Sequence, residues 1–171
     1  MTDSSSPALI SYAESAIVED DALLAARTRA AELGTNPVSP SVGALLALLA
    51  RATDARAVVE IGTGTGVSGL WLLNGMAPDG VLTTIDPEPE HHRAARRSFA
   101  GGDIPAGRTR LINGTPTEVL PRLTDASYDL VFVDGPLIDH PRYVREAIRM
   151  LRPGGVVAVS YTHLTLPTSD L

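Results

Sequence analysis

The chain has 171 residues, of which 44% are hydrophobic and 20% charged, and this composition is typical of one globular domain. Its net charge of −6 argues against a nucleic-acid partner held through its phosphates. The absence of cysteine excludes disulfides, thiolate catalysis and cysteine-ligated metals, and it suits a reducing cytosol. No export signal is visible, and the longest apolar run, residues 43–50, is too short to span a bilayer. We therefore predict a cytoplasmic protein without a membrane partner.

The first third of the chain is predicted to be helical after a disordered start at residues 1–7. Apolar residues recur at helical spacing through residues 8–33. The acidic residues 19–21 can begin a second helix, because negative charge favours a helix N-terminus, and Gly34 can end it. A Ser-Pro start signal then predicts a third helix over residues 39–52.

From residue 57 onward, strands are predicted to alternate with helices. The strands are short and continuously apolar, as strands buried on both faces are. Alternation of this kind predicts an α/β fold with a parallel sheet and ligands at the C-terminal strand ends. The predicted strands are 57–61, 81–85, 109–112, 129–133 and 155–159, and the predicted helices are 66–76, 88–99, 116–123 and 140–151.

A glycine-rich turn, IGTGTG, follows the first predicted strand. Glycines at alternate positions allow a sharp turn and the close approach of a ligand, and the helix that follows offers free N–H groups. The second strand ends at Asp86, whose carboxylate can accept two hydrogen bonds from a ribose diol. These features predict a ligand with a nucleoside part.

Two cofactors fit such a turn. A dinucleotide site favours Gly-x-Gly-x-x-Gly, whose third glycine would fall at Val67, and it needs no acid before the turn. S-adenosylmethionine has a zwitterionic methionine end that needs an acid and backbone donors, which Glu60 and the turn supply. Its ribose needs the second acid, Asp86. The residues favour S-adenosylmethionine, and an NAD(P)-dependent Rossmann oxidoreductase is the alternative.

Four segments in order, VVEIGTGTGVSGLWLL, VLTTIDPEPEH, SYDLVFVDG and LRPGGVVAV, resemble the class I S-adenosylmethionine-dependent methyltransferases. The resemblance runs from about residue 9 to Val159, and its branch is the small catechol/caffeoyl-CoA-type O-methyltransferases, bacterial members included. It implies a Rossmann-like fold with strand order 3-2-1-4-5 behind N-terminal helices. It also implies methyl transfer to a hydroxyl of a small molecule, and a homodimer, because dimers are common in this branch.

The resemblance implies the roles of single residues. Ser68 would hydrogen-bond the methionine carboxylate, and the backbone of Val38 would touch the same end of the cofactor. The family commonly has Gly-Asp-Ala after its third strand, where this chain has Gly-Thr-Pro, so Thr115 is the predicted contact to adenine. The cofactor-binding residues implied in this way are Val38, Glu60, Gly62, Thr63, Gly64, Gly66, Ser68, Asp86 and Thr115.

The resemblance places the chemistry at Asp134. In the family a divalent metal such as Mg²⁺ lowers the pKa of the acceptor hydroxyl and orients it, and Asp134 matches the first of three ligands. The other two ligands would fall at Ser160 and Tyr161, which are neither carboxylates nor amides. The family's lysine, a candidate general base, is missing too. We therefore predict Asp134 as the catalytic residue and do not expect tight magnesium binding.

Other polar residues have a plainer interpretation. His91 and His92 are predicted to lie on an exposed helix face, and a contact with the adenine is the alternative. His140 is predicted to be a solvated residue in the first turn of its helix, and a catalytic base is the alternative. Asp139 is the predicted N-cap of that helix. Trp71 has helical spacing from the glycine turn and is predicted to lie in the core.

The composition changes after Val159. Residues 160–171, SYTHLTLPTSDL, have no helical period and resemble a translated sequencing-library adapter. We expect this tail to be non-native, and residues 8–159 to be a methyltransferase domain without its sixth and seventh strands. A truncated S-adenosylmethionine-binding remnant without activity is then a further alternative.

Overall fold

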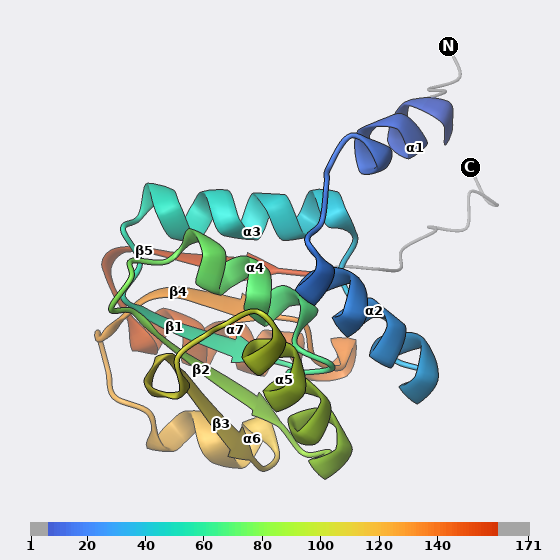
Figure 1. Cartoon of the computed structure of the whole chain (residues 1–171). Coiled ribbons are helices and arrows are strands. Elements are labelled where there is room, and N and C mark those ends of the chain that lie inside the picture. The colour runs from blue at the N-terminus through green and yellow to red at the C-terminus, as the bar shows by residue number, and fades with distance from the viewer. Residues whose placement is uncertain (1–6, 161–171) are drawn as a thin grey trace, which may run out of the picture.

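A parallel five-stranded sheet lies at the centre of the computed structural model, which describes residues 7–160 (Figure 1). Its strand order, β3-β2-β1-β4-β5, confirms the predicted fold class. The predicted disordered start, apart from Pro7, and the predicted non-native tail, apart from Ser160, lie outside the described residues. The strands are β1 (Ala57–Ile61), β2 (Val81–Asp86), β3 (Thr109–Asn113), β4 (Tyr128–Val133) and β5 (Leu151–Val159).

Helices cover both faces of this sheet (Figure 1). The α-helices are α1 (Pro7–Ser15), α2 (Asp21–Leu33), α3 (Pro40–Ala52), α4 (Val67–Gly75), α5 (Pro89–Gly101), α6 (Pro116–Val119) and α7 (His140–Met150), and the 3-10 turns are η1 (Ala106–Arg108), η2 (Leu120–Arg122) and η3 (Leu137–Asp139). Among the residues described here, no helix is long and apolar enough to cross a membrane.

The core divides into two clusters because successive residues of a strand point to opposite faces. On one face, Val58 and Leu82 pack with residues from α2, α3, α4 and α5. On the other face, Val59 and Ile85 pack with η2 and α7, including the fully buried Met150. The strands read as continuous apolar runs for this reason, as the sequence predicts.

Helix ends follow the local signals in the sequence. The Asp20 side chain accepts a hydrogen bond of 2.9 Å from the Leu23 N–H, and Gly34, with a φ of 65°, ends α2. Ser39 is the N-cap of α3. The helix predicted over 116–123 is instead divided into α6 and η2, because Pro121 has no N–H to continue an α-helical ladder.

Strand β5 begins earlier than predicted. It starts at Leu151, which pairs with Tyr128, and the next pair of the ladder joins Leu130 to Val156. The Pro-Gly-Gly segment between these pairs is therefore a bulge within the strand, and its Gly154 has a φ of 85°. Such a segment is typical of a turn, which is why the sequence predicts a start at Gly155.

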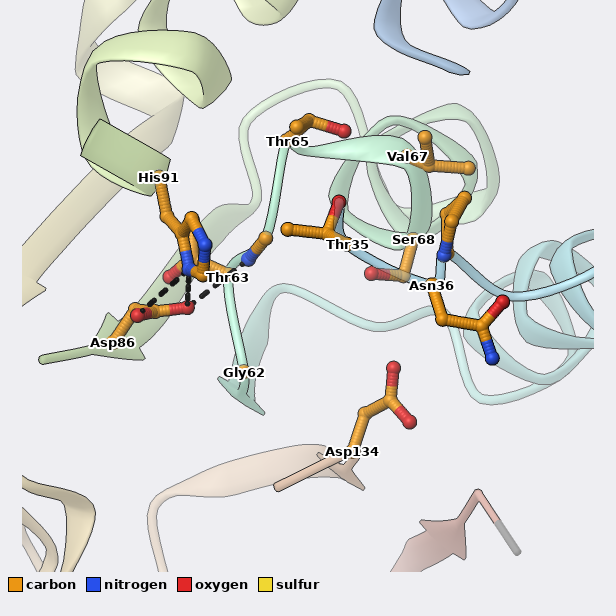
Figure 2. Close-up of a pocket in the computed structure, with 12 residues that line it drawn as sticks. Thr35, Asn36, Gly62, Thr63, Thr65, Val67, Ser68, Asp86, His91 and Asp134 are labelled. Carbon is orange, nitrogen blue, oxygen red and sulfur yellow. Dashed lines mark hydrogen bonds and ion pairs between the residues drawn. The ribbon is translucent and has the colours of Figure 1, made fainter. Parts of the chain in front are cut away.

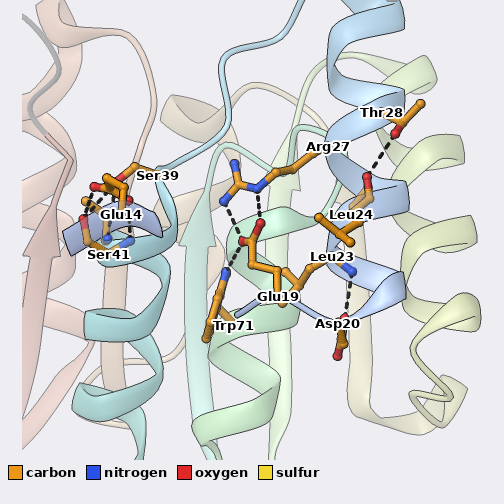
Figure 3. Close-up of polar contacts among 12 residues, drawn as sticks. Glu14, Glu19, Asp20, Leu23, Leu24, Arg27, Thr28, Ser39, Ser41 and Trp71 are labelled. Atoms are coloured by element: carbon orange, nitrogen blue, oxygen red, sulfur yellow. Dashed lines mark hydrogen bonds and ion pairs between the residues drawn. The ribbon is translucent and has the colours of Figure 1, made fainter. Parts of the chain in front are cut away.

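Two glutamates fasten the N-terminal helices to the rest of the molecule (Figure 3). Glu14 of α1 accepts hydrogen bonds of 2.9 Å from the Ser39 hydroxyl and the Ser41 N–H at the start of α3. Glu19, before α2, accepts bonds of 2.5 and 2.7 Å from Arg27 and one of 3.2 Å from the Trp71 Nε1–H of α4. These contacts hold the chain that leads into α2 against α4.

Close packing of α3 on α4 rests on two glycines. A Cβ atom at Gly43 would overlap the Trp71 ring, and one at Gly75 would overlap the backbone of Ala47. Trp71 packs against the core, as predicted. This packing sets the position of α4, whose N-terminus meets the ends of the strands.

Candidate functional site

A cavity of about 190 Å³ lies where β1, β2 and β4 end (Figure 2). Six of the predicted site residues line it, namely Gly62, Thr63, Gly64, Ser68, Asp86 and Asp134. Six further residues complete the lining, namely Thr35, Asn36, Pro37, Thr65, Val67 and His91, of which only His91 was considered for a cofactor contact. The structure thus brings together side chains from the α2–α3 turn, the glycine turn, and the ends of β2 and β4.

The glycine turn has a backbone that side chains rarely permit. Gly62, Gly64 and Gly66 have φ values of 100°, 49° and 87°. A Cβ atom at Gly62 would lie 2.8 Å from the carbonyl oxygen of Asp134. Gly66 is the N-cap of α4 and has no side chain to cap it, so the first N–H groups of α4 are free to meet an anion.

Asp86 is held in place by three donors. Its Oδ2 accepts a hydrogen bond of 3.1 Å from the Gly64 N–H, and its Oδ1 accepts one of 2.9 Å from the Glu88 N–H. The Nδ1 of His91 lies 3.1 and 3.0 Å from the two carboxylate oxygens (Figure 2). Because these groups fix its orientation and its side chain is only 7% exposed, Asp86 is a preset acceptor at the cavity wall.

Glu60 lies behind the cavity wall and does not line it. Its side chain is fully buried, and it accepts hydrogen bonds of 2.5 Å from the Ser68 hydroxyl and 2.6 Å from the Thr84 hydroxyl. Burial raises the pKa of this carboxyl from 4.5 to about 7, although the two hydroxyls oppose the shift. Glu60 is therefore linked to the cavity through Ser68, which lines it.

This arrangement suggests a second ligand group for Ser68 besides the predicted carboxylate. While Glu60 is ionised, the Ser68 hydroxyl donates its hydrogen to Glu60 and can offer a ligand only its lone pairs. A positively charged ammonium suits those lone pairs better than the predicted carboxylate does. The carboxylate end of a ligand is better placed at the free N–H groups of α4.

Besides Glu60, three predicted residues lie outside this cavity. Val38 is buried in the core, and its neighbours Asn36 and Pro37 take the cavity wall instead. Gly66 shapes the turn without lining the cavity. Thr115 lines a second cavity.

The second cavity measures about 320 Å³ and adjoins the first. The two cavities share Gly62, Asp86, His91 and Asp134. Most of the other walls are apolar: Ile61, Ile85, Pro87, Pro116, Pro136 and the Tyr143 side chain. Glu88, Thr115 and Asp139 contribute polar groups, and Gly135 completes the lining.

Asp134 lines both cavities from the end of β4. Burial raises the pKa of its carboxyl, and the Ser160 side chain and His140 partly offset that shift. Residues 7–160 contain no group of three or more histidine or acidic side chains placed to share a metal ion. Tyr161, the place of the third ligand in the resemblance, lies outside the described residues. The donors present do not fit a family-type metal centre.

Three histidines differ from their predicted exposure. His91 lines both cavities, and His92 is buried with its Nε2 2.9 Å from the Asp86 carbonyl oxygen. His140 is buried as well, with its Nε2 2.8 Å from the Gly135 carbonyl oxygen. Since carbonyl oxygens accept, both Nε2 atoms carry the hydrogen. The prediction of exposed histidines was wrong because the first turns of α5 and α7 fold back over the strand ends. For His91, its position five residues after Asp86 was the sequence feature that pointed to the site.

Comparison with known proteins agrees with this geometry. The O-methyltransferase family model matches residues 10–164. A protein of Mycobacterium sp. (strain JLS) that is named among the O-methyltransferases is 58% identical over 152 residues, which cover 89% of this chain and 69% of that protein.

Solved structures share the fold. A Corynebacterium glutamicum protein shares 35% identity at a TM-score of 0.84, covering 90% of this chain and 72% of that one. The O-methyltransferase TomG of Streptomyces achromogenes, solved in complex with S-adenosylmethionine, shares 35% identity at a TM-score of 0.81, covering 88% of this chain and 69% of TomG.

These findings confirm the fold and the family predicted from the four sequence segments, and they favour the methyltransferase over the oxidoreductase alternative. The chain belongs to the O-methyltransferase family.

Proposed function

We propose that this protein transfers the methyl group of S-adenosylmethionine to a hydroxyl of a small molecule, and that the cofactor spans the two cavities. The observation that carries the proposal is the place of Asp86, which lines both cavities and offers a preset carboxylate between them. A ribose bound there would put an amino-acid end in one cavity and a base in the other. The bound S-adenosylmethionine of TomG supports this choice of cofactor.

The first cavity suits the methionine end. The free N–H groups at the start of α4 would hold its carboxylate. The Ser68 hydroxyl and the amide oxygen of Asn36 would hold its ammonium. Val67 lines this cavity at the place where a dinucleotide turn would have its third glycine, which makes a dinucleotide the weaker candidate.

The second cavity suits the adenine. Isoleucine, proline and tyrosine side chains give it apolar walls, against which a flat base can pack. Thr115 lies at this end and offers one hydroxyl to the edge of the base. In this proposal Thr115 makes the adenine contact that the resemblance implies.

Asp134 has the role of general base in this proposal. When bound, the cofactor supplies a methyl group on a positively charged sulfur. Asp134 lies where the two cavities meet, and its carboxylate would accept the proton of an acceptor hydroxyl held beside that methyl group. The pKa of Asp134 is raised, so this carboxylate is a stronger base than an exposed aspartate.

Calorimetric titration of the full chain with S-adenosylhomocysteine and, separately, with NAD tests the cofactor. We expect binding of S-adenosylhomocysteine that Asp86→Asn weakens and the exposed-site control Asp79→Asn leaves unchanged. Tight binding of NAD without binding of S-adenosylhomocysteine would overturn the proposal.

Turnover of a panel of catechols and other hydroxyl acceptors, with and without Mg²⁺, tests the reaction itself. Methyl transfer is the expected result, whereas cofactor binding without turnover of any acceptor would favour the inactive remnant. The cytoplasmic location, the homodimer and the lack of a nucleic-acid partner stay predictions from the sequence.

A further inference from the structure

The second cavity contains a carboxylate that no strong donor satisfies. Asp139 stands at the N-cap position of α7, but its side chain makes no capping hydrogen bond. Within residues 7–160 it forms no ion pair with an arginine or a histidine. Its one hydrogen bond, from the Tyr143 hydroxyl to Oδ2, measures 3.4 Å, which is long for two oxygen atoms.

The surroundings of Asp139 limit what can satisfy it. It is half-buried at the edge of a cavity whose other walls are largely apolar, so a ligand that fills the cavity displaces water from this carboxylate and must supply a donor in its place. An ionised carboxylate only accepts hydrogen bonds. The ligand group opposite Asp139 must therefore carry an N–H or O–H.

Asp139 lines the same cavity as Asp86, the ribose acceptor. Asp86 ends β2, while Asp139 follows β4, and β1 pairs with both of these strands. Neighbouring strands lie about 4.8 Å apart, so the ends of β2 and β4 are separated by roughly 10 Å. A nucleoside whose ribose meets Asp86 is long enough to bring the far edge of its base toward Asp139.

We propose that Asp139 accepts a hydrogen bond from the 6-amino group of the cofactor's adenine and selects for that group. This inference rests on the proposed function, because it takes the ligand of the two cavities to be S-adenosylmethionine. A base without the amino group would leave the Asp139 carboxylate buried beside it without a donor. Binding sites with such a hydrogen bond discriminate strongly against analogues that lack the donor group.

The test compares two ligands, S-adenosylhomocysteine and its analogue in which hydrogen replaces the 6-amino group. Calorimetric titration of the full wild-type chain should show an affinity for S-adenosylhomocysteine about 10- to 100-fold above that for the analogue, as expected for a hydrogen bond to a charged group. In Asp139→Ala this ratio should fall below about 3-fold, because the acceptor is gone.

Two further variants separate recognition from a structural effect. Asp139→Asn keeps an amide oxygen that can accept, so its ratio should be intermediate. The control Asp125→Asn removes an acid that pairs with Arg149 away from both cavities, and it should keep the wild-type ratio.

The results distinguish this inference from the proposed function. Asp139 does not recognise the amino group if the wild-type chain binds both ligands equally well, or if Asp139→Ala keeps the wild-type preference for S-adenosylhomocysteine. In either case the proposed function stands. If the wild-type chain binds neither ligand, the proposed function fails and this inference fails with it.

Discussion

Asp134 is the residue whose substitution separates chemistry from binding. Asp134→Asn keeps the shape of the side chain but removes its ability to accept a proton from the acceptor hydroxyl. We expect kcat to fall by about 10²- to 10⁴-fold, the usual contribution of a general base, while S-adenosylhomocysteine still binds. Steady-state kinetics and calorimetry on the same preparation measure both quantities. A kcat equal to that of the wild type would remove Asp134 from the reaction.

Glu60 links the stability of the fold to pH. Its pKa is about 7 in the folded protein against 4.5 for an ordinary glutamate, so the folded state holds a proton that the unfolded state releases between these values. The contribution of Glu60 to the free energy of unfolding should therefore be fully present below pH 4.5 and be lost as the pH rises to about 7. The loss should be on the order of 3 kcal/mol, since each pH unit corresponds to about 1.4 kcal/mol.

Glu60→Gln supplies the reference for this measurement, because glutamine does not titrate. Urea unfolding of both proteins across this pH range gives two curves of stability. We expect the wild type to lose stability relative to Glu60→Gln as the pH rises. Parallel curves would show that Glu60 titrates normally in the folded protein.

Local patterns identify some site residues and miss others for a physical reason. Asp86 could be predicted because it follows a buried strand, and the end of such a strand is a ligand-binding edge. The burial of Glu60 between two hydroxyls could not be predicted. Thr84 contacts Glu60 only because β2 pairs with β1 and places the two residues opposite each other. His91 and His140 were missed because their burial depends on how helices pack on the sheet.

The turn between β1 and α4 offers a matched pair of glycine substitutions. A Cβ atom at Gly62, where φ is 100°, would meet the Asp134 carbonyl oxygen at 2.8 Å. Gly64 also has a positive φ, of 49°, but a Cβ atom there has no neighbour within 4 Å. Gly62→Ala should destabilise the protein by about 1–3 kcal/mol and weaken cofactor binding, and Gly64→Ala by about 1 kcal/mol.

Thermal unfolding and S-adenosylhomocysteine titration of the two glycine variants measure the difference. If the two variants were equally stable, the close approach of Gly62 to β4 would not matter and only the backbone conformation would.

Elements follow the sequence where their signals are local. Asp20, Ser39 and Gly34 mark helix ends through contacts within a few residues, so the bounds of α2 and α3 could be predicted closely. The early start of β5 could not be predicted, because a Pro-Gly-Gly segment becomes part of a strand only when the residues on both sides of it pair with a neighbouring strand. The split of α6 from η2 was visible in Pro121 and should have been predicted.

At the scale of the whole molecule, both core clusters contain residues of the same strands, so the two faces of the sheet depend on each other. The strand order came from the family resemblance, because alternation of strands and helices predicts a parallel sheet without ordering its strands. The shared sheet predicts that residues 7–160 unfold in one cooperative transition.

A ligand that joins β1, β2 and β4 at their ends should then stabilise all of these elements together. With S-adenosylhomocysteine at about 100 times its Kd, linkage predicts about 2.7 kcal/mol of added stability. For a chain of this size that corresponds to a rise in Tm of roughly 5–10 °C. Differential scanning calorimetry should show one transition that moves as a whole, and Asp86→Asn should reduce the shift at the same ligand concentration. A second transition that stays in place would mean that part of the chain folds independently of the site, and a shift with NAD alone would contradict the choice of cofactor.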